Sequence, residues 1–334
     1  MKVRLADIAE ATGYSVNTVS HALRDLPDIS AAAKEKIRAA AEALDYIPNR
    51  QAGSFKSGRR GVISVILPDI VNPHFTLLFH EAETYFQGLG ITSLFINTGE
   101  SPEEEERAVR TSIGQNVDGV ILCPTAGSRA AALLSRAGIP YVLVGRYLGE
   151  EHDAVVTDDE EGGYLATRHL LSLGHERIAC VRIDGEISSD RERYAGYVRA
   201  HSERGLTPDP AMTLHLSPRA RENAAAIEGF LLAHPDCRAI FSFSDLLANE
   251  ILAVAHRLGR RIPEELSVVG YDRIEDACPL PLPLTTVGTD GEGLGLAAAR
   301  LLHRRTEGNE EGKERMILPV CLKVGSSSGE FKKN

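Results

Sequence analysis

The segment ATGYSVNTVSHAL, residues 11–23, sets the interpretation of the start of this 334-residue chain. The stretch RLADIAEATG, which overlaps its start, places Leu5 and Ile8 on one helical face. It ends at Gly13, a residue that favours helix termination. Ser15 is a good N-cap for a second helix of about two turns. Two short helices joined through TGYS predict a helix-turn-helix.

Helical spacing separates the apolar and polar side chains of the second helix. Val19 and Leu23 lie about 40° apart on the helix and face the first helix, whereas Asn17 and His21 lie almost opposite them. Asn can pair bidentately with adenine in the DNA major groove, and His can donate to guanine or phosphate. The same pattern also fits a solvated amphipathic helix of a small helical domain, and spacing alone leaves both readings open.

The following sequence predicts a third helix, a linker and an α/β body. SAAAKEKIRAAAEAL begins at Ser30 with helical spacing, and Pro48 breaks the pattern. NRQAGSFKSGRRG is polar, basic and glycine-containing, which is typical of a linker. From Gly61 onward, β-rich runs such as VISVIL and YVLVG alternate with helical stretches, so we expect parallel sheets covered on both faces. The length of this part predicts two α/β lobes, with ligand bound between them at strand ends.

Charge and cysteine content narrow the functional classes. Residues 1–60 carry a net charge of +3 within a chain of net charge −10, so a mildly basic head precedes an acidic body and suits contact with a polyanion. Five widely spaced cysteines without a CxxC pair argue against a disulfide framework and favour a reducing cytoplasm. We find no membrane-spanning apolar run or leader. GEGLGLAAA lacks the dinucleotide-binding spacing, and we expect no cofactor, metal site or catalytic site.

A long series of motifs resembles the lactose/galactose-repressor family of bacterial transcription regulators. The series runs from LADIAEATGYSVNTVSHALRD through VDGVILCPT, GGYLATRHLLSLGH, RYAGY, AIFSFSDLLA, SVVGYD and PLTTV. The resemblance implies a helix-turn-helix head, a hinge segment and a two-lobed core like that of periplasmic sugar-binding proteins. It also implies a homodimer that binds near-palindromic double-stranded operator DNA and responds to a small-molecule effector.

The resemblance assigns DNA-binding positions in the head and hinge. Val16, Asn17 and His21 match base-reading positions, and His21 stands where an arginine is common. Arg4 replaces a frequent threonine cap, so we expect the first helix to lose a cap worth about 1 kcal/mol. Phe55 stands where a leucine wedges into the minor groove, although it could instead pack on the core. The full DNA-binding set is Ser15, Val16, Asn17, Thr18, Ser20, His21, Asn49, Ala52 and Phe55.

The resemblance also assigns an effector site. An aromatic face together with arginine and aspartate suits a polar ring or a sugar. A structural salt bridge between the lobes, from Arg193 to Asp272, is the alternative. Gly145 and Ser244 replace a frequent aspartate and asparagine, and the chain has no tryptophan to stack on a sugar. The predicted effector-binding residues are His74, Phe75, Thr125, Arg146, Arg193, Phe241 and Asp272.

The predicted organisation is a helix-turn-helix domain at 1–48, a hinge at 49–60, a core for effector binding and dimerisation at 61–325, and a polar tail at 326–334. The tail lacks leucine heptads, so we expect a dimer. The predicted function is a cytoplasmic repressor controlled by a sugar or sugar derivative. Alternatives are a regulator responding to a nucleobase, nucleoside or phosphorylated metabolite, and an activator of the same fold. The helical head and the missing signal sequence argue against a periplasmic-type solute-binding protein, and no nucleophile–base pair or metal cluster supports an enzyme.

Overall fold

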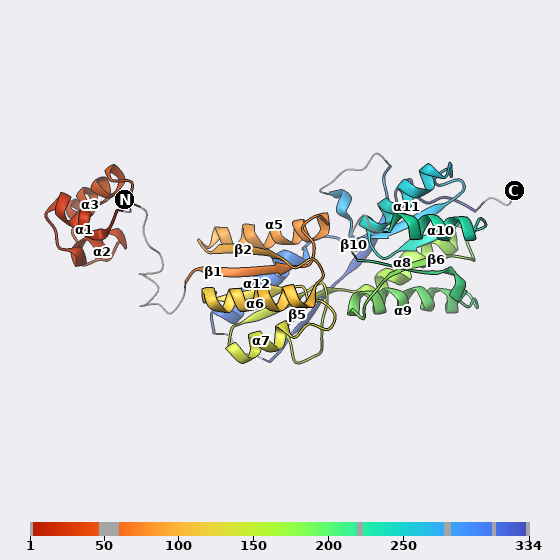
Figure 1. Cartoon of the computed structure of the whole chain (residues 1–334), viewed down its shortest axis with the longest axis horizontal. Coiled ribbons are helices and arrows are strands. Elements are labelled where there is room, and N and C mark those ends of the chain that lie inside the picture. The colour runs from red at the N-terminus through yellow and green to blue at the C-terminus, as the bar shows by residue number, and fades with distance from the viewer. Residues whose placement is uncertain (1–2, 47–59, 219–222, 277–281, 309–311, 332–334) are drawn as a thin grey trace. The chain divides into compact units, whose positions relative to one another are not determined.

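The computed structural model describes residues 3–46, 60–218, 223–276, 282–308 and 312–331. The chain forms two compact units, residues 1–60 and residues 61–334. Figure 1 shows helices alone in the first unit and both helices and strands in the second. The predicted helical head and α/β body are therefore confirmed.

Three helices pack around a small apolar core in the first unit. They are α1 (Leu5–Thr12), α2 (Val16–Leu23) and α3 (Ala31–Ala43). Ile8, Val19 and Ile37, one from each helix, are fully buried in this core. Because α2 packs through Val19, its opposite side remains available for contacts outside the unit.

Side-chain oxygens satisfy backbone groups at the helix starts of the head. Ser15 and Ser30 each accept from the backbone N–H three residues on, at 3.1 Å and 3.3 Å. The side chain of Arg4 makes no capping hydrogen bond, as predicted. Instead, the backbone N–H of Arg4 donates to the Asp7 carboxylate at 2.7 Å, which partly compensates for the missing cap.

The first lobe of the second unit is a parallel sheet with strand order β11-β5-β4-β3-β1-β2. Its strands are β1 (Val62–Leu67), β2 (Thr92–Asn97), β3 (Gly119–Leu122), β4 (Tyr141–Val144), β5 (Ala154–Thr157) and β11 (Arg315–Leu318). Its helices are α5 (Pro73–Gly88), α6 (Pro102–Gln115), α7 (Ala130–Ala137) and α12 (Leu294–Thr306). Ile63 and Val65 pack with α5 and α12, whereas Ile66 packs with α6 and α7. The strand therefore alternates between two covered faces.

The second lobe repeats this design with strand order β12-β10-β9-β8-β6-β7. Its strands are β6 (Ala179–Ile183), β7 (Thr213–Leu216), β8 (Ala239–Ser242), β9 (Ser267–Tyr271), β10 (Thr285–Thr289) and β12 (Val320–Lys323). Only the β10–β12 pair is antiparallel among the described strands. Its helices are α8 (Asp159–Ser172), α9 (Ser188–Glu203), α10 (Ala224–Ala233) and α11 (Asp245–Arg257), with 3₁₀ turns η1 (Pro210–Met212) and η2 (Ile274–Asp276). The pair α8 and α9 covers one face, and α10 and α11 cover the other.

Two glycines bring α8 and α9 close together. A Cβ on Gly163 would lie 2.0 Å from the carbonyl oxygen of Arg193, and a Cβ on Gly196 would lie 2.0 Å from that of Glu160. Neither position has room for a side chain. The close approach fixes the position of Arg193, which is one of the predicted effector-binding residues.

The described chain passes between the lobes at three places: from β5 to α8, from β10 to α12, and from β11 to β12. Each lobe is therefore built from two segments of the chain that are separated in the sequence by a segment of the other lobe. Figure 1 shows β5 and β10 where the two sheets meet. A change in the angle between the lobes must be absorbed at these connections.

The prediction of a separate polar tail at 326–334 is wrong for its described part. Ser327 is fully buried; its hydroxyl donates to the Val268 carbonyl at 2.6 Å and accepts from the Thr285 N–H at 2.8 Å. Nε2 of His175 lies 2.9 Å from the Gly329 carbonyl oxygen. This polar segment is part of the second lobe because backbone partners satisfy its hydroxyl groups.

Candidate functional site

The exposed side of α2 carries the predicted base-reading residues. Val16 is 48% exposed and Asn17 is also exposed, whereas Val19 on the other side is fully buried. The remaining predicted contacts on this helix are exposed or half-buried: Ser15, Thr18 and Ser20. The orientation of α2 is therefore confirmed, and DNA contact by these side chains stays a prediction.

His21 is held by Asp28, a residue that the sequence did not indicate. Nδ1 of His21 lies 2.5 Å from Oδ2 of Asp28. The hydrogen bond from His21 lowers the pKa of the Asp28 carboxyl. Asp28 lies in the turn between α2 and α3, and helical spacing does not predict where such a turn places its side chains. His21 is therefore not a freely rotating side chain.

Three predicted DNA contacts, Asn49, Ala52 and Phe55, lie outside the described residues. Their contacts with the operator stay predictions.

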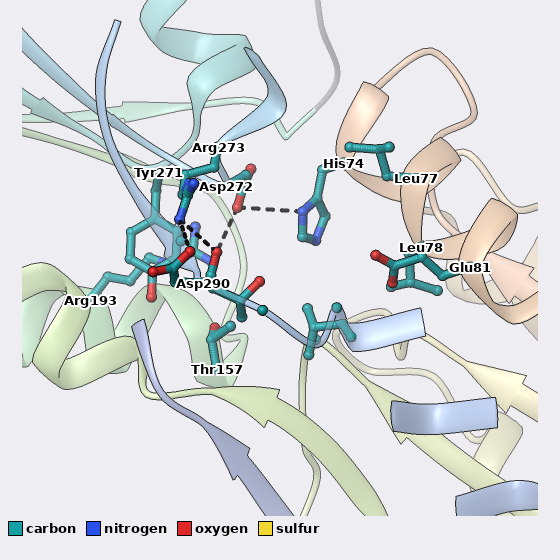
Figure 2. Close-up of a pocket in the computed structure, with 16 residues that line it drawn as sticks. His74, Leu77, Leu78, Glu81, Thr157, Arg193, Tyr271, Asp272, Arg273 and Asp290 are labelled. Atoms are coloured by element: carbon teal, nitrogen blue, oxygen red, sulfur yellow. Dashed lines mark hydrogen bonds and ion pairs between the residues drawn. The ribbon is translucent and has the colours of Figure 1, made fainter. Parts of the chain in front are cut away.

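A cavity of about 260 Å³ lies between the two lobes. Figure 2 shows His74, Leu77, Leu78 and Glu81 on α5, on one side of it. Facing them from the second lobe are residues around the end of β9, including Asp272, which lies 3.8 Å from Nδ1 of His74. Arg193 also lines this cavity. The predicted convergence of His74, Arg193 and Asp272 in a cleft is observed, and their contact with an effector remains a prediction.

Arg193 is the centre of a buried ionic and aromatic cluster. Its Nε donates to Asp159 at 2.8 Å, and its terminal nitrogen Nη2 lies 3.6 Å from Asp272. The guanidinium carbon lies 3.5 Å from the ring centroid of Tyr271 and 4.6 Å from that of Phe243. Burial acts to lower the pKa of Arg193, but the carboxylates of Asp159 and Asp272 outweigh it, so the pKa is raised. Arg193 is therefore a fixed cation whose charge is already paired.

In Asp159, burial has a larger effect on the pKa than the neighbouring charge does. Burial raises its pKa, and the charge and hydrogen bond of Arg193 only partly offset this effect. The predicted alternative was a structural salt bridge between the lobes. Arg193 does lie 3.6 Å from Asp272, but both residues belong to the second lobe, and the carboxylate closest to Arg193 is that of Asp159.

The turn after β9 presents Asp272 to the cavity through an unusual backbone. Asp272 and Arg273 have φ values of 107° and 54°, in the region that favours glycine. Asp245 supports this turn by accepting from the Ile274 N–H at 3.0 Å and from the Thr286 hydroxyl at 2.6 Å. Burial, followed by the charge of Asp272, raises the pKa of Asp245 well above its usual value. A buried carboxyl therefore holds the strained turn in place.

Arg146 and Phe75 line a second, smaller hollow that shares His74, Arg193 and Asp272 with the first. The guanidinium of Arg146 donates to Glu100 at 2.6 Å and 2.8 Å, and both side chains are largely buried. Burial acts to lower the pKa of Arg146, but nearby anionic groups outweigh it and raise the pKa. Glu100 lies in the turn after β2, and only the three-dimensional structure brings it to the cleft.

Two predicted effector-binding residues do not line either cavity. Phe241 is 1% exposed and packs in the core with α8 and α9, because strand alternation turns it towards that face. Phe243 takes its place at the cleft, where its carbonyl oxygen accepts from Arg193 at 2.5 Å. Thr125 is buried, and its N–H donates to Glu105 at 2.7 Å. We therefore correct the predicted positions of Phe241 and Thr125.

Tyr147 connects the first lobe to α9 in the second lobe. Its N–H donates to the Ser188 hydroxyl at 2.9 Å, and its own hydroxyl donates to Glu192. Arg191 donates to the same tyrosine oxygen at 3.0 Å. These contacts link the two lobes directly.

The described residues contain no group of three or more His, Cys, Asp or Glu side chains arranged to hold a metal ion. No helix in the described ranges is long and apolar enough to cross a membrane.

Known families match both units of the chain. The family described as "Bacterial regulatory proteins, lacI family" matches residues 4–49, and the "Periplasmic binding protein-like domain" matches residues 167–328. The HTH-type transcriptional regulator DegA of Bacillus subtilis (strain 168) is 30% identical over 333 residues, which cover 98% of each chain.

Solved structures agree with these matches over the whole length. The lac repressor dimer bound to operator and the anti-inducer ONPF has a TM-score of 0.85 and 25% identity, and the match covers 98% of this chain and 100% of the repressor chain. The complex of the transcriptional regulator CelR with cellobiose has a TM-score of 0.74 and 29% identity, with the same coverage.

Proposed function

The chain belongs to the lacI family of bacterial regulatory proteins and is a DNA-binding transcriptional regulator. We propose that it is a cytoplasmic repressor and that an uncharged polyhydroxylated ligand, such as a sugar, controls it. The ligand binds in the cleft between the lobes and changes the affinity for operator DNA. We further propose that two copies of the chain form a homodimer, as in the related lac repressor dimer. Residues 1–48, 49–60 and 61–331 then serve as head, hinge and core.

The exposed side of α2 supports the DNA-binding part of the proposal. Asn17 and Val16 stand on the side of α2 opposite the buried Val19, so α2 can enter the major groove without unpacking the head. A twofold-symmetric dimer would place two such helices on half-sites about 34–36 Å apart, or at a multiple of that spacing.

The pairing of cleft arginines is the observation that carries the choice of ligand class. Arg146 pairs with Glu100, and Arg193 pairs with Asp159 and Asp272. A phosphorylated ligand would have to displace a carboxylate from one of these cations, and breaking a buried pair costs about 3–5 kcal/mol. Hydroxyl groups of a neutral ligand can instead donate to the lone pairs that the carboxylates retain.

Aromatic and carboxylate groups in the cleft suit a polyhydroxylated ring. Phe75 and Phe243 supply apolar faces for C–H groups, and Asp272 supplies an acceptor in the same hollow. The related CelR structure contains cellobiose, which is an uncharged sugar. Nucleosides are also neutral and carry ribose hydroxyls, so they form the second class of candidate ligand.

A thermal-shift screen of the full chain tests the ligand class. The panel pairs neutral sugars and nucleosides with their phosphorylated counterparts at equal concentrations. A ligand at 100 times its Kd stabilises the folded protein by about 2.7 kcal/mol. We expect at least one neutral compound to raise the melting temperature more than its phosphate ester. Stabilisation only by the phosphorylated members would contradict the proposal.

Repression is separated from activation by transcription in vitro. DNA recovered by selection from a random library is placed over a promoter, and the purified chain is added with RNA polymerase. A repressor lowers the transcript yield in a manner that depends on the selected site. A rise in transcript yield would show that the chain activates instead.

A further inference from the structure

We propose that Asp28 determines which DNA base His21 recognises, by holding the proton on Nδ1 of the imidazole and leaving Nε2 for the base edge. This inference rests on the proposed DNA-binding function. Asp28 acts through His21 and is therefore a positioning residue, whereas His21 makes the contact. The distance between Nδ1 of His21 and Oδ2 of Asp28 is 2.5 Å, so the two side chains are in direct hydrogen-bond contact.

The direction of this hydrogen bond follows from the state of the carboxyl. The pKa of Asp28 is lowered, first by its hydrogen bond with His21, so the group is an ionised acceptor at neutral pH. An ionised carboxylate has no proton to donate. Nδ1 of His21 must therefore carry the shared proton, and this fixes the tautomer of a neutral ring.

Nε2 is the ring atom that remains for DNA. The side chain of His21 is 20% exposed. Among the described residues, Nε2 of His21 is not one of the buried side-chain atoms without a hydrogen-bond partner. None of the hydrogen bonds within the described head uses it. A base edge can therefore approach Nε2 without displacing a protein group.

The protonation state of the ring then selects the base. In a neutral ring, Nε2 accepts a hydrogen bond, and the major groove offers amino donors on cytosine N4 and adenine N6. In a doubly protonated ring, Nε2 donates, and the major groove offers the O6 and N7 acceptors of guanine. With Nδ1 protonated and held by Asp28, Nε2 of the neutral ring faces the base as an acceptor, so we expect His21 to select cytosine or adenine rather than guanine.

Other charged groups near this pair are engaged separately. Arg24 on α2 donates to the Ser20 carbonyl at 3.1 Å. Asp25 pairs with Lys34 at 3.0 Å and with Arg38 at 2.7 Å, both on α3. Lys34 also lowers the pKa of Asp28 through its charge, although less than His21 does. Asp25 thus supplies a matched control carboxylate on the same surface that does not contact His21.

Selection of DNA sequences by wild type and variants tests the inference. The full chain is incubated with a random double-stranded library at pH 8. The recovered DNA is sequenced for wild type and for Asp28→Ala, Asp28→Asn, Asp25→Asn and His21→Ala. Circular dichroism confirms that each variant retains the helical head.

We expect one position of the half-site to prefer cytosine or adenine in wild type and in Asp25→Asn. The preferred base is enriched there at least five-fold, because one good base contact is worth about 1–3 kcal/mol. In Asp28→Ala, the preference at this position falls to that of His21→Ala. Asp28→Asn retains an oxygen acceptor and keeps the wild-type preference.

Two results overturn the inference. A preference in Asp28→Ala equal to that of wild type would show that Asp28 does not set the contact. A wild-type preference for guanine at the position that depends on His21 would show that Nε2 does not act as an acceptor. Failure to enrich any sequence would instead overturn the proposed DNA-binding function, and the inference with it.

Discussion

Removal of the Arg193 charge is expected to destabilise the core strongly. In Arg193→Met the side chain keeps most of its length, but Asp159 and Asp272 lose their cation inside a closed cluster. Breaking a buried pair in this way costs about 3–5 kcal/mol. In a unit of this size, about 2 °C of melting temperature is lost for each kcal/mol, so we expect a decrease of roughly 6–10 °C.

The loss in Arg193→Met should also depend on pH. Burial already raises the pKa of Asp159 above its usual range, and the mutation removes the cation that opposes this effect. A raised folded-state pKa means that stability is lost as pH rises from the ordinary aspartate value through the folded value. The deficit relative to wild type should therefore be smaller near pH 4 than near pH 7.

Urea unfolding of the full chain, followed through the transition of the core, measures both effects. Arg199→Met is the matched control, because Arg199 also lies on α9 but is 37% exposed and pairs with Glu160 and Glu161 at the surface. Exposed pairs of this kind contribute about 1 kcal/mol or less. Equal stability of Arg193→Met and Arg199→Met would refute the assignment of Arg193 as a buried, paired cation.

Three further substitutions test separate parts of the structure. In Asp245→Asn, the lost hydrogen bond from the Ile274 N–H lowers stability at every pH. Because the pKa of Asp245 is raised, wild type loses stability as pH rises above 3.8, so the difference in unfolding free energy between wild type and mutant should narrow between pH 4 and pH 8 in urea unfolding. A difference that stays constant with pH would contradict this. In Tyr147→Phe, loss of the hydroxyl contact between the lobes should lower stability by about 1–3 kcal/mol and broaden the distribution of inter-lobe distances measured between spin labels. An unchanged distance distribution would argue against that contact. Ile37→Ala should destabilise the head by about 2–5 kcal/mol and leave the calorimetric transition of the core unchanged; a shift of the core transition would show that the two units do not unfold separately.

Periodicity predicted the parts of this fold in which local spacing decides burial. Val19 and Asn17 took the predicted sides of α2 because a two-turn helix fixes their angle. The alternation of β-rich and helical runs predicted the two α/β lobes for the same reason. Arg193 and Asp272 met at the cleft because both lie near ends of elements that border it.

The residues whose positions were not predicted correctly depend on strand ends, turns and long-range contacts, which the spacing of residues along the sequence does not show. Phe241 lies within β8 and faces the core, whereas Phe243 lies just beyond the end of the strand and lines the cleft. Asp28 meets His21 through the path of a turn. Ser327 can be buried because backbone groups of β9 and β10 satisfy its hydroxyl, a condition that polar composition alone cannot reveal.

Operator binding in the presence of a cleft ligand tests the central claim most directly. The full chain is titrated into a fluorescent operator obtained by selection, with and without a neutral compound that raises its melting temperature. We expect the ligand to change the operator Kd about 5-fold to 150-fold in wild type, and to have no effect in Asp272→Asn. A ligand that stabilises the wild-type core but leaves its operator Kd unchanged would contradict the coupling between cleft and DNA.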